Sequence, residues 1–425
     1  GDWIGQRNKI FETYVPLEPD KKFNLKSQSF FILNSMGIAS NRDAWVYNSS
    51  KVNVSENMLS MINFYNEQVE DYKNHKPMDG DKLSAKDFID KNPSKISWSS
   101  SLIPKLENGL NAIFQEDKIF PAHYRPFTKQ YLYYGEKMIH RRSQSDFIYP
   151  IPNTFKTRNI CIPGIGVTKD FSCLMTNGLT DMELVGKNQC FPLHYYEERQ
   201  KSSPGLFDSD GDSEFIRRDG ISDFILERAR KVYGKNVSKE DIFYYVYGIL
   251  HNQDYRTAFE NDLKKMLPRL PLVEDVRDFW KFSKSGRQLA ELHINYEEVE
   301  PLDSVKVQLP EANLQMDAYE FYSVEKMRFP KKDIKHTINY NSRITISNIP
   351  EKAYEYVVNG KSAIEWIMER YQIKVDKNSG IKNDPNDWSR ENEKPSYILD
   401  LLLSIINVSV QTVDIVNDLP KIKFD

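Results

Sequence analysis

The chain has 425 residues, of which 40% are hydrophobic and 28% are charged, as expected for a folded protein of two or three domains. Its net charge of −3 gives no support to indiscriminate nucleic-acid binding. Three cysteines without a CxxC pair argue against a disulfide framework or a zinc ribbon and favour a reducing compartment, so we expect a cytoplasmic protein.

The first third of the chain predicts one long helix. The chain begins "GDWIGQRNKIF" without a methionine, and we expect it to be a piece of a longer protein. Asn53 and Glu56 have the spacing of a capping box. Apolar residues then recur at helical spacing, which predicts a helix over 53–73: Met58, Ile62, Tyr65, Val69 and Tyr72. We assign residues 1–118 to an N-terminal segment, with another short helix around 102–116.

From 119 to 201 the sequence changes to short aromatic and β-branched runs broken by Pro and Gly, which predicts a β-rich subdomain. It opens with "HYRPFTKQYLYYGEKMIHRR" (123–142), which holds five Lys or Arg and four Tyr against one acid. Between Pro121 and Asp170 there are eight basic and three acidic residues, a local charge of +5 on an otherwise acidic chain. Such a basic region can act as an electrostatic footprint, although it can also be an ordinary solvated surface.

The aromatic and basic side chains of this region suggest different roles. Tyr131, Tyr133 and Phe147 are more easily explained as core residues of a small sheet than as platforms for bases. Lysine and arginine could bind phosphates, and arginine could also read guanine edges. The candidate DNA-binding residues are Arg125, Lys129, Arg141, Arg142, Lys156, Arg158 and Lys169.

The remainder of the chain reads as a loop followed by helices. Ser, Gly and Asp predict a mobile loop over 202–220. Residues 221–425 form a helix-rich subdomain in this interpretation, with a helix that ends before Pro268 and a hairpin near 334–347. Ser362 and Glu365 form a second capping box, and two apolar helical segments lie near 397–418. The expected fold class is α+β.

We find no catalytic residues and no metal site in the sequence. "PGIGVTK" (163–169) lacks the spacing of a phosphate loop, and "DSDGDSE" (208–214) lacks the glycine and glutamate positions of a calcium loop. The histidines form no HxxxH pair. Asp254, Asp262 and Lys264 loosely match a nuclease pattern but have the spacing of a solvated helix face.

Several stretches resemble the C-terminal part of Type ISP single-chain restriction-modification enzymes. They include "NRDAWVYNSSKVNVSENMLSMINFYNEQVE" (41–70), "YVYGILHNQDYRTAFENDLKKMLPRLPLV" (245–273) and "NGKSAIEWIMERYQIKVDKNSGIKNDPNDW" (359–388). The resemblance implies a target-recognition region for duplex DNA. We expect the β-rich middle and the helix-rich C-terminal half to form a DNA-binding cleft. The parent enzyme would methylate adenine N6 with SAM, translocate with ATP and Mg²⁺, and cleave unmodified DNA.

The fragment itself is expected to hold no cofactor and to perform no catalysis. Its expected partners are double-stranded DNA and the upstream methyltransferase and ATPase regions of the same polypeptide, with no membrane. Base-reading residues are expected in the loops between 135 and 190, outside the matching motifs. Two alternatives remain open: an architectural domain that couples the methyltransferase to the ATPase, and a self-contained nuclease.

Overall fold

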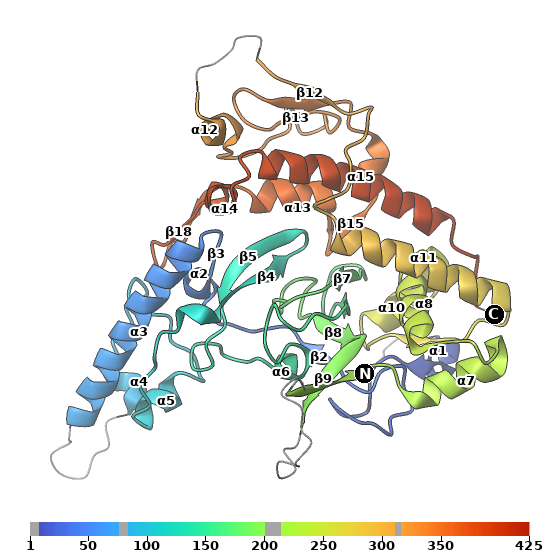
Figure 1. Cartoon of the computed structure of the whole chain (residues 1–425), viewed down its shortest axis with the longest axis horizontal. Helices are drawn as coiled ribbons and strands as arrows, with labels where there is room; N and C mark the ends of the chain where they lie inside the picture. Colours follow the sequence, from blue (N-terminus) through green and yellow to red (C-terminus); the bar gives the residue numbers. More distant parts are fainter. Residues whose placement is uncertain (1–7, 76–83, 200–213, 311–315, 425) are drawn as a thin grey trace, which may run out of the picture.

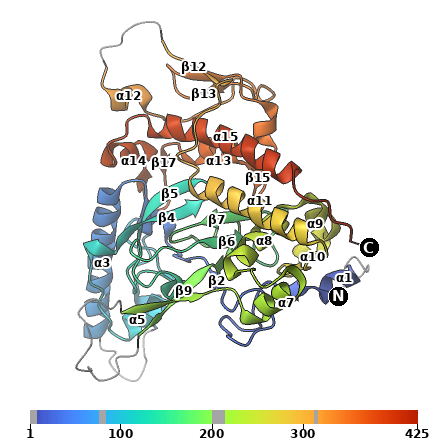
Figure 2. The same cartoon turned by 45° about the vertical axis from the view of Figure 1, so that its right-hand side comes forward.

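The structure is a computed structural model that describes residues 8–75, 84–199, 214–310 and 316–424. Figure 1 shows three lobes in a triangular arrangement, and Figure 2 shows the same arrangement from a second direction. The long helix α3 (Lys51–Asn74) lies along one lobe. Helices α8 (Lys239–His251) and α11 (Val276–Ile294) pack together in the second, and α15 (Tyr397–Asn417) crosses the third.

The remaining helices are short. The other α-helices and 3₁₀ helices are α1 (Lys9–Thr13), α2 (Asp43–Val46), α4 (Ala85–Phe88), α5 (Ile103–Glu107), η1 (Glu116–Lys118), α6 (Ser145–Ile148), α7 (Asp223–Tyr233), α9 (Gln253–Ala258), α10 (Glu260–Leu263), α12 (Ala318–Tyr322), η2 (Glu351–Tyr354), α13 (Ala363–Arg370) and α14 (Pro385–Glu391). The expected α+β fold, with a β-rich middle and a helix-rich C-terminal half, is confirmed.

The strands form small antiparallel sheets, and the two largest lie in the middle of the chain. One has the order β2–β8–β6–β7 and the other the order β3–β5–β4. Their strands are β2 (Ser35–Met36), β3 (Tyr47–Asn48), β4 (Ile119–Arg125), β5 (Thr128–Tyr133), β6 (Asn159–Ile162), β7 (Leu174–Thr176) and β8 (Gln189–Pro192). The smaller sheets use β1 (Val15–Pro16), β9 (His194–Glu198), β10 (Phe215–Asp219), β11 (Arg269–Leu270), β12 (Lys306–Gln308), β13 (Ile338–Asn339), β14 (Thr345–Ser347), β15 (Val357–Val358), β16 (Lys361–Ser362), β17 (Lys374–Val375) and β18 (Lys382–Asn383).

Helix termini follow local capping chemistry. The Oγ of Ser362 accepts a hydrogen bond from the N–H of Glu365, whose carboxylate accepts from the N–H of Ser362, so the predicted capping box of α13 is present. Helix α3 begins at Lys51, earlier than the expected start at 53. Its N-cap is Ser50, whose Oγ accepts from the N–H of Asn53 at 2.9 Å, so a capping box at Asn53 is wrong.

Two further expectations differ from the observed elements. The single helix expected before Pro268 is divided into α9 and α10, because Phe259 leaves the helical conformation at φ −117° and ψ 24°. Of the loop expected over 202–220, residues 202–213 lie outside the described residues, while Phe215–Asp219 form β10 and pair with β9. The hairpin expected near 334–347 contains the antiparallel pair β13–β14.

The core has three clusters, each built from segments far apart in sequence. Cluster 1 gathers the N-terminal segment, β6, β8 and helices α7 to α11. Cluster 2 lies around α13 and α15, and cluster 3 lies between α3 and the sheet of β4 and β5. The subdomain boundaries expected at 118, 201 and 220 remain predictions.

Helices α8 and α11 approach each other closely at two glycines. A Cβ at Gly286 would stand 1.9 Å from the carbonyl oxygen of Tyr244, and a Cβ at Gly248 would stand 2.3 Å from that of Phe282. Because real atoms never approach so closely, this crossing requires glycine on both helices. Helix α15 is long and apolar enough to cross a membrane by composition, but most of it is buried inside the protein, as in the core helix of a folded domain.

Candidate nucleic-acid interface

The β4–β5 hairpin carries two of the candidate cations, and both are neutralised by acids from other segments. The guanidinium of Arg125 lies 2.7 Å from the carboxylate of Asp181 and 3.3 Å from that of Asp43, and only 13% of its side chain is exposed. Burial raises the pKa of Asp181 to about 7, although the charge of Arg125 acts in the opposite direction. The ammonium of Lys129 lies 2.6 Å from Glu297, in the chain after α11.

Arg142 and Arg158 are also bound within the protein. Arg142 donates to the carbonyl of Tyr134, stacks over the Tyr134 ring at 4.1 Å and pairs with Asp146 at 3.3 Å. Arg158 lies 2.6 Å from the carboxylate of Glu291. Four of the seven candidate cations therefore hold parts of the fold together, and the structure does not bring all seven onto one wall.

Three candidates are exposed and form no ion pair among the residues that the structure describes: Arg141, Lys156 and Lys169. They do not form one group. Lys169 packs beside Gly360 in the β15–β16 turn, whereas Lys156 lies near Tyr196, whose hydroxyl donates to the Lys156 carbonyl. Arg141 alone lies in a groove with other cations.

This groove, which we call the basic groove, lies at the β2 edge of the four-stranded sheet and has a volume of about 510 Å³. Three cations, Lys22, Arg141 and Lys187, line it together with two acids, Glu18 and Glu183, and with Gln189. All three cations are exposed, and none forms an ion pair within the described ranges. Burial raises the pKa of Glu18, while the charges of Lys22 and Arg269 act to lower it.

Residues 37–39 bring the walls of the basic groove together. The N–H of Gly37 donates to the carbonyl of Asn188, next to Lys187, and Ala39 exchanges two backbone hydrogen bonds with Arg141. A Cβ at Gly37 would stand 2.6 Å from the carbonyl oxygen of Asp181, so only glycine fits there. The geometry of the groove therefore depends on a close backbone contact.

Gln189 supplies the groove with an oriented amide. Its Oε1 accepts a hydrogen bond from Nδ2 of Asn34 at 3.1 Å, which fixes the side chain. Its Nε2 donors have no protein partner in the described part of the chain, and they can donate to a base edge or a phosphate.

Of the three cations that line the basic groove, the sequence singled out Arg141 but not Lys22 or Lys187. Lys187 lies in the loops between 135 and 190 that we considered for base reading, and its signal is the turn sequence "VGKN", in which Lys187 has φ +46°. Lys22 carries no such signal. Of the expected core aromatics, Tyr133 is buried, whereas 47% of Phe147 is exposed and its ring stacks on Phe23 at 6.3 Å. The expectation for Phe147 is wrong because it lies on the outer side of the short helix α6.

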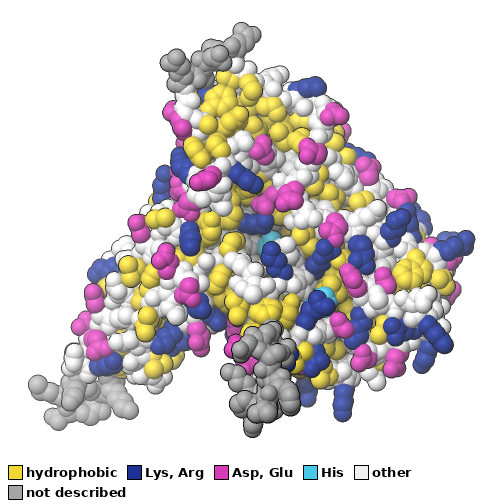
Figure 3. Space-filling model, viewed as in Figure 1, with side chains coloured by type: hydrophobic (Ala, Val, Ile, Leu, Met, Phe, Trp, Pro, Cys, Tyr) yellow, Lys and Arg dark blue, Asp and Glu magenta, His cyan; other side chains and the backbone are white. Residues whose placement is uncertain are grey.

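Charge is mixed on the face of the molecule that Figure 3 shows, where Lys and Arg side chains are interspersed with Asp and Glu. Groups of three or more His, Cys, Asp or Glu that could hold a metal ion are absent from the described residues.

Three solved structures of protein–DNA complexes share this fold. A nuclease-deletion mutant of the Type ISP restriction-modification enzyme LlaGI, in complex with a DNA substrate mimic, matches the whole chain with a TM-score of 0.82 and 38% identity. The ATP-dependent Type ISP enzyme LlaBIII bound to DNA matches with a TM-score of 0.84 and 36% identity. A DrdV–DNA complex, at 24% identity and a TM-score of 0.78, shares the fold.

The chain belongs to the Type ISP C-terminal specificity domain family, whose sequence model matches residues 29–401. The solved structures cover the whole chain, and it spans 35% of the LlaGI chain, 25% of the LlaBIII chain and 40% of the DrdV chain. Among curated proteins no relative matches. The expected family is therefore confirmed.

Proposed function

We propose that this chain recognises the target sequence in duplex DNA for a multidomain Type ISP restriction-modification enzyme. The observation that carries the proposal is its likeness over its full length to two DNA-bound Type ISP enzymes at 36% and 38% identity. The basic groove supplies the chemistry. Lys22, Arg141 and Lys187 bind backbone phosphates, and Gln189 donates to a base edge or a neighbouring phosphate.

The parent enzyme, in this proposal, acts in the cytoplasm. It methylates adenine N6 with SAM and, at unmodified sites, moves along DNA with ATP and Mg²⁺ before cleavage. This chain contributes recognition and no catalysis. Lys156 and Lys169 are secondary phosphate contacts, because both are exposed. The other four candidates contribute little to DNA binding because acids of the protein already neutralise them: Arg125, Lys129, Arg142 and Arg158.

The experiment that tests this function is selection of bound duplexes from a random pool by the purified chain. We expect a consensus sequence, and we expect a variant with Lys22, Arg141 and Lys187 all changed to Ala to enrich none. Enrichment of no sequence by the wild-type chain, at low and at physiological salt, would contradict the proposal.

A second candidate function, coupling of the methyltransferase and ATPase regions, is favoured by an exposed apolar surface. Val232 on α7 and Trp280 on α11 are 47% and 37% exposed, and their helices are in contact through Tyr233, which stacks on Phe279 at 4.0 Å. We expect Val232→Ser combined with Trp280→Ser to weaken binding of the chain to the upstream regions of its parent while DNA binding persists.

A further inference from the structure

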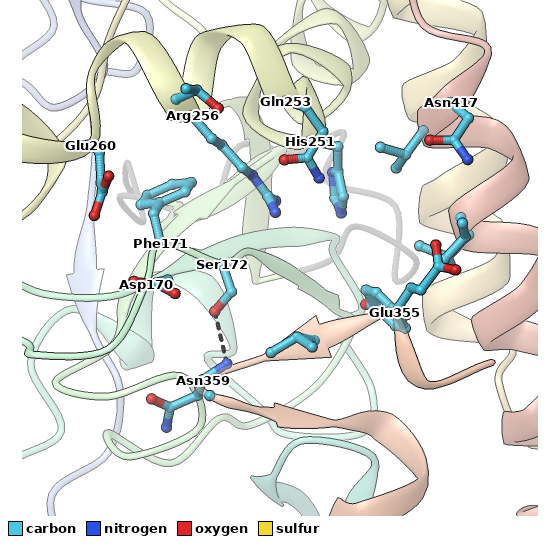
Figure 4. Close-up of a pocket in the computed structure, with 17 residues that line it drawn as sticks. Asp170, Phe171, Ser172, His251, Gln253, Arg256, Glu260, Glu355, Asn359 and Asn417 are labelled. Carbon is cyan, nitrogen blue, oxygen red and sulfur yellow. Dashed lines mark hydrogen bonds between the residues drawn. The ribbon is translucent and has the colours of Figure 1, made fainter. Parts of the chain in front are cut away.

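A second pocket, distinct from the basic groove, lies where core clusters 1 and 2 meet (Figure 4). It has a volume of about 430 Å³. Four segments line it: residues 170–172 before β7, the α8–α9 junction, the turn between β15 and β16, and the C-terminal part of α15. Among the described residues, side chains from all four segments reach one space.

Arg256 provides a fixed positive charge in this pocket. Its Nε donates to the carbonyl of Leu250 at 2.6 Å, and its Nη2 lies 3.5 Å from the sulfur of Cys173. No carboxylate of a described residue lies within ion-pair distance of the Arg256 guanidinium. Glu260, one helical turn later, forms an ion pair with Lys264 instead, with Nζ and Oε1 2.5 Å apart. The guanidinium is thus held in place with a free edge, the geometry that arginine uses to bind oxyanions.

Further donors face the same space. In Figure 4, Arg256, His251 and Gln253 extend from the α8–α9 junction toward Ser172 and Asn359 on the opposite side. The hydroxyl of Ser172, which is 3% exposed, accepts from the N–H of Asn359 at 3.0 Å and so keeps its own hydrogen for donation. Gln253 is exposed at the start of α9 and can donate through its amide.

His251 adds an acceptor. Its Nδ1 donates to the carbonyl of Tyr247 at 2.8 Å, because a carbonyl can only accept. Burial, and then the charge of Arg256, hold the pKa of His251 well below its ordinary value, so the ring is neutral and Nε2 carries a lone pair. The sulfur of Cys173 lies 3.7 Å from this nitrogen, a weak contact that a ligand oxygen can replace. A ligand that bonds to all of these groups needs anionic oxygens that accept from the donors and one hydroxyl that donates to Nε2 of His251. A singly protonated phosphate has both. An ionised carboxylate or a phosphodiester has no hydroxyl to donate.

We propose that this pocket binds a small protonated phosphate, either inorganic phosphate or the terminal group of a phosphate monoester. Arg256, Ser172 and Gln253 donate hydrogen bonds to its oxygens, and Nε2 of His251 accepts a hydrogen bond from its hydroxyl group. Asp170, Glu260 and Glu355 also line the pocket and disfavour polyanions, although Glu260 is paired with Lys264. Because the pocket joins α9, the β15–β16 turn and α15, bound phosphate would fix the junction of clusters 1 and 2.

The test is calorimetric titration and thermal unfolding of the whole chain with inorganic phosphate at pH 7 and constant ionic strength. We expect saturable binding and a higher Tm with phosphate or glycerol phosphate, and neither with acetate or chloride. The tighter of the two phosphates identifies the source of the ligand. A short DNA duplex that displaces phosphate would overturn the proposal, because the pocket would then hold a diester.

Variants separate this site from general surface effects. Arg256→Gln should weaken phosphate binding at least tenfold, while Arg277→Gln, which changes a 92% exposed arginine elsewhere, should leave it unchanged. Since Arg256→Gln also removes the bond to Leu250, Gln253→Glu serves as the second variant. It adds an anion to the pocket at the first residue of α9, where an acid suits the helix, so folding should persist while binding falls at least tenfold. Unchanged phosphate binding in Gln253→Glu, or equal losses in Arg277→Gln, would refute the site.

Discussion

Replacement of Arg141 by Ala is the most direct single change in the basic groove. Only the backbone of Arg141 is bound, through Ala39, and its side chain is exposed without an ion pair in the described ranges, so the fold should persist. Loss of one charge-assisted contact with a phosphate is worth about 1.5 kcal/mol, or a roughly tenfold higher Kd. The slope of log K against log salt should become less negative by about 0.9.

Fluorescence anisotropy with a cognate duplex at 50 to 200 mM salt measures both quantities. The triple change of Lys22, Arg141 and Lys187 to Ala should reduce the slope by about 2.7, so that a fourfold change in salt alters the affinity about 40-fold less than in the wild type. Arg277→Ala, which removes an exposed cation far from the groove in sequence, is the matched control. If the triple variant kept the affinity and the slope of the wild type, the basic groove would not be the DNA contact.

Three further predictions concern stability. Gly286→Ala should lower the free energy of unfolding in urea by about 3 kcal/mol or more, because the α8–α11 crossing leaves no room for a Cβ atom. Gly178→Ala is the control and should change the free energy of unfolding little, because a Cβ there would lie 3.6 Å from its nearest neighbour, Nε2 of His123. Arg125→Met should cost about 3–5 kcal/mol because it leaves the buried Asp181 without its partner, and Arg125→Met with Asp181→Leu should recover part of that loss. Burial raises the pKa of Glu365, but the hydrogen bonds from Ser362 and Lys335 outweigh the effect of burial and lower this pKa below its ordinary value of 4.5. The ionised carboxylate of Glu365 therefore stabilises the fold above pH 4.5, and this stabilisation is lost as the pH falls further. Glu365→Gln should therefore flatten the acid side of the profile of Tm against pH, and an unchanged profile would contradict this assignment.

The elements with strong local signals could be predicted from sequence. The capping box at Ser362 uses contacts three residues apart, and it appears where the sequence places it. The start of α3 combines a local cap at Ser50 with a contact that the sequence does not show. The carboxylate of Glu391 accepts from the N–H of Lys51 at 2.7 Å, a contact between residues 340 positions apart.

The candidate site was less predictable because charge alone does not say what a cation contacts. Lys129 and Arg158 have the composition of a phosphate-binding surface, yet their partners are Glu297 and Glu291 from the chain around the end of α11. Conversely, Lys22 and Lys187 are 165 positions apart, and only the folded chain around Gly37 brings them to the groove that holds Arg141. Local sequence contains neither kind of information.

The contrast between a basic middle region and an acidic remainder therefore has two physical consequences. Three of the eight basic side chains attach the β-rich middle to acids of other segments, Arg125 to Asp43, Lys129 to Glu297 and Arg158 to Glu291. Arg142 pairs with Asp146 within the middle itself, so much of the local +5 charge is neutralised inside the fold. Of the candidate cations in this region, Arg141, Lys156 and Lys169 remain exposed without an ion pair in the described ranges, so the region itself can bind few phosphates. Under the proposed function, sequence selection comes from the groove, while most of the affinity for the DNA backbone must come from cations outside the β-rich middle.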